Sequence, residues 1–355
     1  KRDIFIVKII NNNNLERNMN IIATIGPKST DKWVIKELIE NGVNTLRLNC
    51  SHFNKEEFEN VISYSRNLKS NVHILVDLSG KKIRISKDLK YIYKVYNNQE
   101  VFFCGEDYYK NLDFDKHKDK KYIPLNLTSD KIKKSNVLSI SMKDNTMSFK
   151  VLGVNNGVVR ARVLKGGIIR GGKGCNISEI YEDGNLLREK DKENILWAIE
   201  QDIDIICQSF VEEREDIENI TKLINKNKGK YKYDIWAKVE TPKGIDNLDE
   251  ILEVVDTVVI GRGDLVPESG ILNSVKLQEV AIERIKEKNK KIIIATHLLN
   301  SMKNGHLATL PEIESIYRFV KLGVDGFLLA GETSIGKAPI QTVKFLKDLL
   351  EYYNR

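Results

Sequence analysis

Short apolar runs of strand length alternate with longer amphipathic stretches from Met19 onward. The first runs span 21–25, 43–48 and 73–78, and stretches with helical spacing at 30–40 and 55–68 separate them, the first opened by a Ser/Thr cap. Strand-like runs that alternate with helix-period stretches are the signature of βαβ units and of a parallel sheet. We therefore expect an α/β fold that begins at Met19.

The alternation stops between Ser86 and Gly171. This stretch has no helical period, and Gly and Asn turns such as 155–157 separate short β-like pieces at 101–103, 122–125, 148–152 and 158–164. A loop of this length without structure of its own would be improbable in a compact fold. The stretch is therefore predicted to be a small β domain inserted after the third strand.

The alternation then resumes, with helices expected at 189–200, 213–225 and 339–353. Five further strands are expected at 203–210, 234–239, 256–261, 291–296 and 324–330. Three strands before the insertion and five after it make eight, the number that closes a (β/α)8 barrel. The predicted fold is an α/β, (β/α)8 TIM barrel (19–85 and 172–355) with a small inserted β-barrel domain that forms a lid (86–171), after an N-terminal arm (1–18).

The formal charge of +7 comes from Lys mixed with Glu and Asp along the predicted helices. Because the sequence has no Lys/Arg block and no basic stripe with aromatic residues, we expect anionic small molecules as ligands, and no nucleic acid. No apolar run is long enough for a membrane span, and four cysteines without a CxxC pair favour a reducing compartment. We expect a cytoplasmic protein; since the chain begins at Lys1 instead of Met, a removed leader would be invisible and an organellar location stays open.

Charged and polar side chains follow the predicted barrel strands, and the carboxyl ends of such strands share one face. These residues are Arg47, Asn49, Ser51, Asp77, Lys82, Arg84, Lys238, Glu240, Arg262, Gly263, Asp264, Thr296, Gly331, Glu332 and Thr333. Glu240 and Asp264 form a natural pair for Mg²⁺, which prefers few protein ligands and keeps several waters. Lysine and arginine beside such a metal suit phosphoryl transfer.

Each of these residues alone has a more ordinary interpretation. Arg47 or Arg84 would be a surface ion pair, Asp77 a helix cap, and Thr296 a strand-end hydroxyl bonded to the backbone. Cys50 has no partner base nearby in the sequence and is expected to be inert. Only the occurrence of the whole set on one barrel face favours an active site.

Several motifs occur together in the order and spacing of one known family. They are Thr24-Ile25-Gly26-Pro27, Leu46-Arg47-Leu48-Asn49-Cys50-Ser51-His52, Lys238-Val239-Glu240, Gly261-Arg262-Gly263-Asp264-Leu265, Ala295-Thr296-His297-Leu298-Leu299-Asn300-Ser301-Met302 and Gly331-Glu332-Thr333. The chain therefore resembles pyruvate kinases from about Met19 to its end, including the β insertion.

The resemblance implies transfer of phosphate between phosphoenolpyruvate and ADP, the last step of glycolysis, with Mg²⁺ or Mn²⁺ as cofactor. The implied catalytic residues are Lys238 at the transferring phosphoryl group, Arg47 at the phosphate and Thr296 near the carbon that is protonated. The implied metal ligands are Glu240 and Asp264, and Gly263 with Asp264 would bind the substrate carboxylate. The implied nucleotide-binding residues are Asn49, His52, Arg84 and Lys190.

Some positions depart from the pattern of the family. Potassium-activated members hold K⁺ with residues that match Asn49, Ser51, Asp77 and the backbone oxygen of Leu78, and they carry Glu where this chain has Lys82. Because a fixed ammonium can do the electrostatic work of a monovalent cation, we expect activity without K⁺.

Further departures concern the lid, the site and the length. The lid segment 142–145 and His297 differ from the usual residues, and the chain stops at Arg355 without the usual C-terminal domain. Loss of effector control and a homo-oligomer smaller than the usual tetramer follow as hypotheses. Two alternatives stay open: a divergent paralogue that acts on another enolpyruvate-like acid, and a non-catalytic phosphoenolpyruvate- or nucleotide-binding protein.

Overall fold

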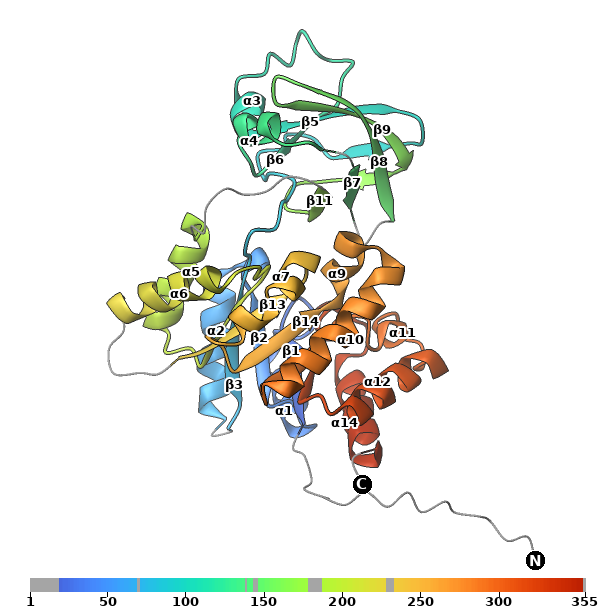
Figure 1. The fold of residues 1–355 in the computed structure, drawn as a ribbon. Helices are drawn as coiled ribbons and strands as arrows, with labels where there is room; N and C mark the ends of the chain where they lie inside the picture. The colour runs from blue at the N-terminus through green and yellow to red at the C-terminus, as the bar shows by residue number, and fades with distance from the viewer. Residues whose placement is uncertain are drawn as a thin grey trace, which may run out of the picture.

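The computed structural model describes residues 19–68, 71–137, 139–142, 146–177, 187–227 and 233–353, and the expected arm 1–18 lies outside them. Eight parallel strands close into a barrel, as the sequence predicts (Figure 1). In spatial order they are β1 (Asn20–Thr24), β2 (Thr45–Asn49), β3 (His73–Leu78), β12 (Ile205–Gln208), β13 (Asp234–Val239), β14 (Thr257–Gly261), β15 (Lys291–Ala295) and β16 (Gly326–Leu329). The carboxyl ends of all eight strands therefore meet on one face.

Helices follow the strands around the outside of the barrel. They are α1 (Lys32–Glu40), α2 (Lys55–Asn67), α5 (Glu189–Glu200), α6 (Arg214–Asn227), α7 (Pro242–Asp246), α8 (Leu248–Ile251), α9 (Arg262–Ser269), α10 (Ile271–Glu287), α11 (Asn300–Lys303), α12 (Leu310–Leu322), α13 (Gly331–Ser334) and α14 (Pro339–Tyr353), with a 3-10 turn η1 (Cys50–His52) after β2. The expected Ser/Thr cap of α1 is wrong. The helix begins after Asp31, whose side chain accepts the N–H of Trp33 at 2.8 Å, because Thr30 lies one residue too early to reach it.

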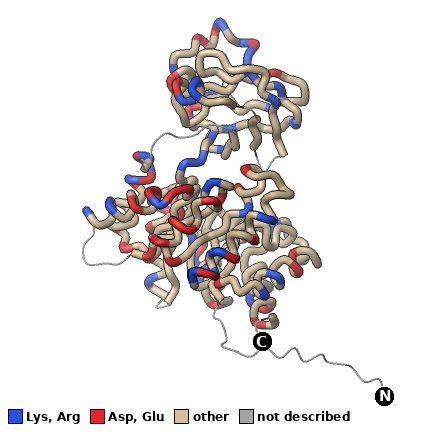
Figure 2. The backbone as a smooth tube through the Cα atoms, in the orientation of Figure 1, with Lys and Arg blue, Asp and Glu red and all other residues tan. Residues whose placement is uncertain are grey.

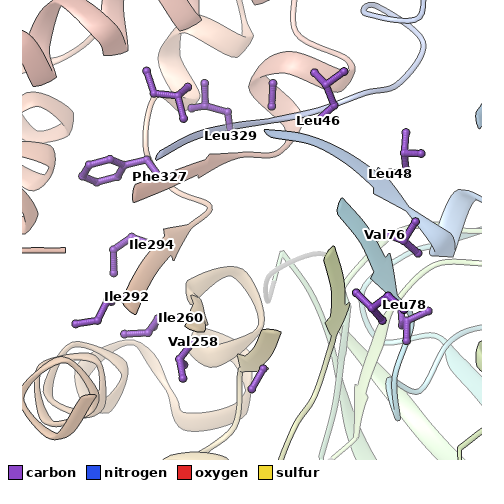
Figure 3. Close-up of a cluster of buried hydrophobic side chains, with 14 of the residues drawn as sticks. Leu46, Leu48, Val76, Leu78, Val258, Ile260, Ile292, Ile294, Phe327 and Leu329 are labelled. Carbon is purple, nitrogen blue, oxygen red and sulfur yellow. The ribbon is translucent and has the colours of Figure 1, made fainter. Parts of the chain in front are cut away.

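Alternate residues of each barrel strand point outwards and inwards, as the two-residue period of a strand requires. The outward residues pack against the helices; Leu46, Leu48, Val76, Leu78, Val258, Ile260, Ile292, Ile294, Phe327 and Leu329 are labelled in Figure 3. A second apolar cluster, which includes Leu75 and Trp236, fills the inside. The next inward positions on the same two strands are Asp77 and Lys238, so the interior changes from apolar to charged towards the carboxyl ends.

The segment between β3 and α5 forms a separate curled sheet with its own hydrophobic core, so the predicted β insertion is confirmed (Figure 1). Its strands are β5 (Glu100–Gly105), β6 (Tyr122–Leu125), β7 (Ser139–Met142), β8 (Met147–Asn155), β9 (Val158–Lys165) and β11 (Cys175–Ile177), and β4 (Tyr93–Val95) pairs with β10 (Gly167–Ile169). The insertion also contains two short helices, although the sequence has no helical period here. Helices α3 (Glu106–Lys110) and α4 (Ser129–Lys134) have five and six residues, too few to show a helical period.

Both parts of the chain carry mixed charge. Lys and Arg are mixed with Asp and Glu over the barrel and the inserted sheet (Figure 2). No helix in the described part of the chain is long and apolar enough to cross a membrane.

The four cysteines are buried and unpaired. Burial raises the pKa of Cys50 well above its ordinary value, which agrees with the expectation of an inert thiol. The altered lid positions 143–145 lie outside the described residues.

Candidate active site

The carboxylate of Asp77, at the carboxyl end of β3, joins the two cationic side chains that the sequence singles out. Lys238 Nζ donates to its Oδ1 and Oδ2 at 2.9 and 2.7 Å, and Arg47 Nε donates to Oδ2 at 2.7 Å. Ser209 Oγ donates to Oδ1 at 2.9 Å. Burial alone would raise the pKa of Asp77, but Arg47 and Lys238 outweigh it and hold the pKa at about 2. Asp77 is therefore an ionised counter-ion, and its interpretation as a helix cap is wrong.

Neighbouring side chains keep Lys238 charged and hold Arg47 in position. Burial would lower the pKa of Lys238, but Asp77 and Glu240 raise it above its ordinary value, so the ammonium stays charged. Arg47 Nη1 donates to Thr24 Oγ1 at 2.8 Å, and that hydroxyl donates to the carbonyl of Leu329 at 2.8 Å. The bonds to Asp77 and Thr24 thus hold both cations, which are buried, on the inner face of the barrel.

Glu240 follows β13, and Asp264 lies near it in the first turn of α9, directly after the neighbouring strand β14. Glu240 is 4% exposed, and its Oε2 accepts the N–H of Phe210 at 3.1 Å. Burial raises the pKa of Glu240 to about 7; Lys238 opposes this shift and Asp264 reinforces it. A Cβ atom on Gly261 would come within 2.5 Å of Glu240 Oε1, so the glycine leaves room for the carboxylate.

These two carboxylates fit a divalent cation. Mg²⁺ and Mn²⁺ take oxygen ligands, and Mg²⁺ usually takes only one or two of them from carboxylates. In the described part of the chain no group of three or more His, Cys, Asp or Glu side chains is arranged to hold a metal. The chemistry of the pair therefore suits an ion that draws its other ligands from water and substrate oxygens.

Lys82, in the loop after β3, forms an ion pair with Asp264. Its ammonium also lies 5.5 Å from the centre of the Phe210 ring. The positive charge of Lys82 thus contacts one of the two metal-ligand candidates directly.

The side-chain oxygens of Asn49, Ser51 and Asp77, expected to hold a monovalent cation, already have donors from the protein. Arg84 Nη2 donates to Ser51 Oγ at 2.6 Å, which lies 3.3 Å from Ser79 Oγ. Asn49 Oδ1 accepts the N–H of Ser51 at 3.1 Å. Leu78 contributes only backbone here, because its side chain points outwards (Figure 3). Arg84 is thus the cation that contacts the Ser51 hydroxyl.

The expected nucleotide-binding side chains gather near Arg84. Burial, followed by the charge of Arg84, lowers the pKa of His52. Burial and Lys87 lower the pKa of Lys190, and Arg84 contributes as well. Arg84 and Lys190 thus bring positive charge to this part of the site, whereas His52, with its lowered pKa, is neutral at pH 7, and Asn49 caps η1.

Thr296 follows β15 in a left-handed backbone conformation. Thr296 and His297 have φ angles of 66° and 52°, which are rare for residues other than glycine. Arg262 holds this turn: its Nη2 donates to the carbonyls of Thr296 and His297 at 2.5 and 2.6 Å. Thr296 Oγ1 accepts the N–H of Gly263 at 2.7 Å. The expected carboxylate-binding groups therefore meet in one place.

A clamp on the β3 loop is the feature that sequence reasoning missed. Asp191, in the first turn of α5, accepts the N–H groups of Ser79 and Gly80 at 3.0 and 2.9 Å. Arg188, the residue before α5, donates to the carbonyls of Lys82 and Lys81 at 3.0 and 2.9 Å. Gly80 has a φ of 63° and lies so close to Ser209 that a side chain would not fit. The only sequence signal was an acidic residue in the first turn of a predicted helix.

The closed (β/α)8 barrel, with buried cations and two neighbouring carboxylates at its strand ends, places the chain in the α/β-barrel class, whose enzymes carry the active site on this face. Residues 16–343 match the family model described as the barrel domain of pyruvate kinase. The chain belongs to the pyruvate kinase family.

Individual relatives agree with this assignment. The chain is 31% identical to a pyruvate kinase from Buchnera aphidicola subsp. Baizongia pistaciae, over 93% of this chain and 69% of the relative. It is 30% identical to one from Clostridium perfringens (90% and 67%) and 29% identical to one from Thermoplasma acidophilum (94% and 57%). The chain thus spans between about half and three quarters of the length of these relatives.

Proposed function

We propose that the chain transfers a phosphoryl group from phosphoenolpyruvate to ADP and yields pyruvate and ATP. The observation that carries the proposal is the Arg47–Asp77–Lys238 cluster, which presents two fixed cations beside the Glu240 and Asp264 carboxylates. Phosphoryl transfer depends on positioning and on positive charge at the equatorial oxygens, and this cluster offers both. The family assignment supports the same reaction.

In the proposed mechanism Arg47 and Lys238 bind the phosphoryl group of the substrate. Lys238 is buried and charged, so it can also stabilise the enolate oxygen that forms when the phosphoryl group leaves. The substrate carboxylate and carbon chain would bind at Gly263, Asp264 and Thr296, where the carboxylate would take the N–H of Gly263 from Thr296 Oγ1. A divalent ion on Glu240 and Asp264, Mg²⁺ or Mn²⁺, would neutralise charge on the phosphoryl and carboxylate oxygens.

On the nucleotide side we propose Arg84, Lys190, His52 and Asn49 as the ADP-binding residues. A nucleotide diphosphate and a phosphorylated substrate repel each other, and cations between them reduce this repulsion. We further propose that Lys82 and Arg84 replace the monovalent cation, because both charges lie within the loop that would surround it. On this proposal K⁺ is not required.

The test is a direct assay of ATP formation from phosphoenolpyruvate and ADP with Mg²⁺. Lys238→Met should abolish turnover, whereas Lys243→Met, on helix α7 with its ammonium on Glu213, should leave it intact. A wild-type protein without turnover, or turnover that survives Lys238→Met, contradicts the proposal. Phosphoenolpyruvate binding without turnover would instead support the non-catalytic alternative. The divergent-paralogue alternative would be supported by turnover of another enolpyruvate-like acid only.

A further inference from the structure

One cavity of about 420 Å³ continues from the proposed substrate site into a region that the proposed reaction does not use. Lys82, Gly263, Asp264 and Thr296 line the part already described. The other lining residues are His297, Asn300, Lys303, Asn304, Ala330 and Glu332. This second part adds the amine of Lys303 to the cavity.

The ammonium group of Lys303, at the end of α11, has no partner among the residues that the structure describes. Its backbone N–H and carbonyl take part in hydrogen bonds with Leu299 and Lys337, but its side chain does not. Lys303 is only partly exposed, and no counter-ion among the described residues pairs with its ammonium. An anion in the cavity would supply that counter-ion.

Gly331 leaves the space that the Lys303 side chain occupies in the cavity. A Cβ atom at position 331 would lie 3.0 Å from Lys303 Nζ and 3.1 Å from Cε. The lysine therefore lies across the glycine, and a larger residue there would push the ammonium away.

The acidic groups of the cavity are already engaged elsewhere. Asp264 pairs with Lys82. Glu332 is 1% exposed and accepts the N–H groups of Ala330 and Leu299 at 2.9 and 3.4 Å. At the rim, Asn300 Nδ2 lies 3.2 Å from His297 Nδ1, so the remaining polar groups are neutral or basic. An entering anion meets an unpaired cation, while the carboxylate of Glu332, which has no ion-pair partner among the described residues, is buried and turned to backbone N–H groups.

We propose that Lys303 forms a second anion-binding subsite, which takes the second carboxylate of a four-carbon dicarboxylic acid. The first carboxylate would bind at Gly263 and Thr296, and this part of the argument rests on the proposed function. The subsite extends the acids that the site accepts beyond those with three carbons. A free anion such as inorganic phosphate has the same oxygen chemistry, so the test separates the two sources.

The test measures the binding of L-malate and L-lactate to the full chain by titration calorimetry with Mg²⁺. The two acids differ by one carboxylate. We expect malate to bind about tenfold more tightly than lactate, as one charge-assisted contact provides. Lys303→Gln should remove this preference and Lys303→Arg should keep it. Lys337→Gln is the matched control, because Lys337 contacts the Lys303 backbone but does not line the cavity.

Two results would overturn the proposal: equal affinities for malate and lactate in the wild type, or a malate preference that survives Lys303→Gln. A titration with inorganic phosphate alone completes the test. Phosphate binding that needs Lys303, without a malate preference, would overturn the dicarboxylate assignment and give the subsite to a separate anion. Melting curves of all variants check the fold. Turnover of phosphoenolpyruvate is measured in the same preparations, so a failure of the proposed function is seen independently of the malate preference.

Discussion

The ammonium of Lys82 lies on the carboxylate of Asp264, the residue that would also bind the divalent metal. At the proposed metal site, a metal ion and this ammonium would therefore compete for the carboxylate of Asp264. In the metal-free protein, the ion pair with Lys82 neutralises Asp264 and reduces its repulsion with Glu240. A metal ion at the proposed site would then displace Lys82 towards its other neighbours, among them the ring of Phe210.

Replacing Lys82 with Gln should increase the affinity of the substrate-free protein for Mn²⁺ by about tenfold, because the competing charge is removed. Paramagnetic resonance of free Mn²⁺ measures this affinity without any turnover. Lys81→Gln is the control, since Lys81 pairs with Asp216 at 2.6 Å and not with Asp264. An unchanged or weaker affinity in Lys82→Gln would show that the ion pair does not limit metal binding.

Activity should not depend on K⁺, because Lys82 and Arg84 already bring positive charge to the loop after β3. The measurement compares initial rates in KCl and in tetramethylammonium chloride at equal ionic strength. We expect less than about tenfold activation, that is, less than about 1.4 kcal/mol of transition-state stabilisation from the ion. A larger activation by KCl would contradict the replacement of the ion by side chains.

Asp77→Asn should destabilise the fold by about 3–5 kcal/mol, because Arg47 and Lys238 would stay buried without their counter-ion. The pKa of Asp77 is about 2 in the folded protein, below the ordinary value near 3.9. The stabilisation is therefore complete above about pH 4 and is lost as the pH falls towards 2. Urea unfolding at pH 7 and pH 3 measures both effects. Ser209→Ala is the control, because it removes only one hydrogen bond to the same carboxylate. If Asp77→Asn were as stable as Ser209→Ala, the counter-ion role of Asp77 would be refuted.

Arg262→Lys should lower kcat/KM for phosphoenolpyruvate at least about tenfold while the barrel stays folded. The guanidinium donates to two carbonyls at once and holds Thr296 and His297 in their left-handed turn. A lysine offers a single ammonium and cannot reproduce this geometry. Burial lowers the pKa of Arg262 to about 10, so its charge is present at neutral pH. Steady-state kinetics with circular dichroism as the folding control decides the outcome; wild-type kinetics in Arg262→Lys would reject the role.

The barrel could be predicted from the sequence because each strand shows an apolar run and each long helix a clear period. The first and last residues of the elements are predicted less well: the strand expected at 203–210 spans only Ile205–Gln208. Hydrophobic runs continue into loops that pack on the core, such as Phe210 and Val211, so apolar character alone does not mark where pairing ends.

The charged residues of the site could also be predicted, because they follow strands whose ends share one face. Their partners could not. Asp77 was identified from its motif, but its bonds to Lys238 and Ser209 join strands that are far apart in the sequence. The contact between Asp191 and the Gly80 loop likewise exists only after the barrel has closed. Tertiary contacts of this kind leave no local period or spacing to detect.

Arg188 and Asp191 connect the segment where the chain leaves the barrel to the segment where it returns to the barrel. The loop that leads into the inserted sheet is held by the first turn of the helix that follows the sheet. The ends of helices fray at lower free energy than the core unfolds. Mild heating should therefore abolish turnover while the barrel is still folded. Lys82 and Arg84 would lose their positions before any barrel strand separates.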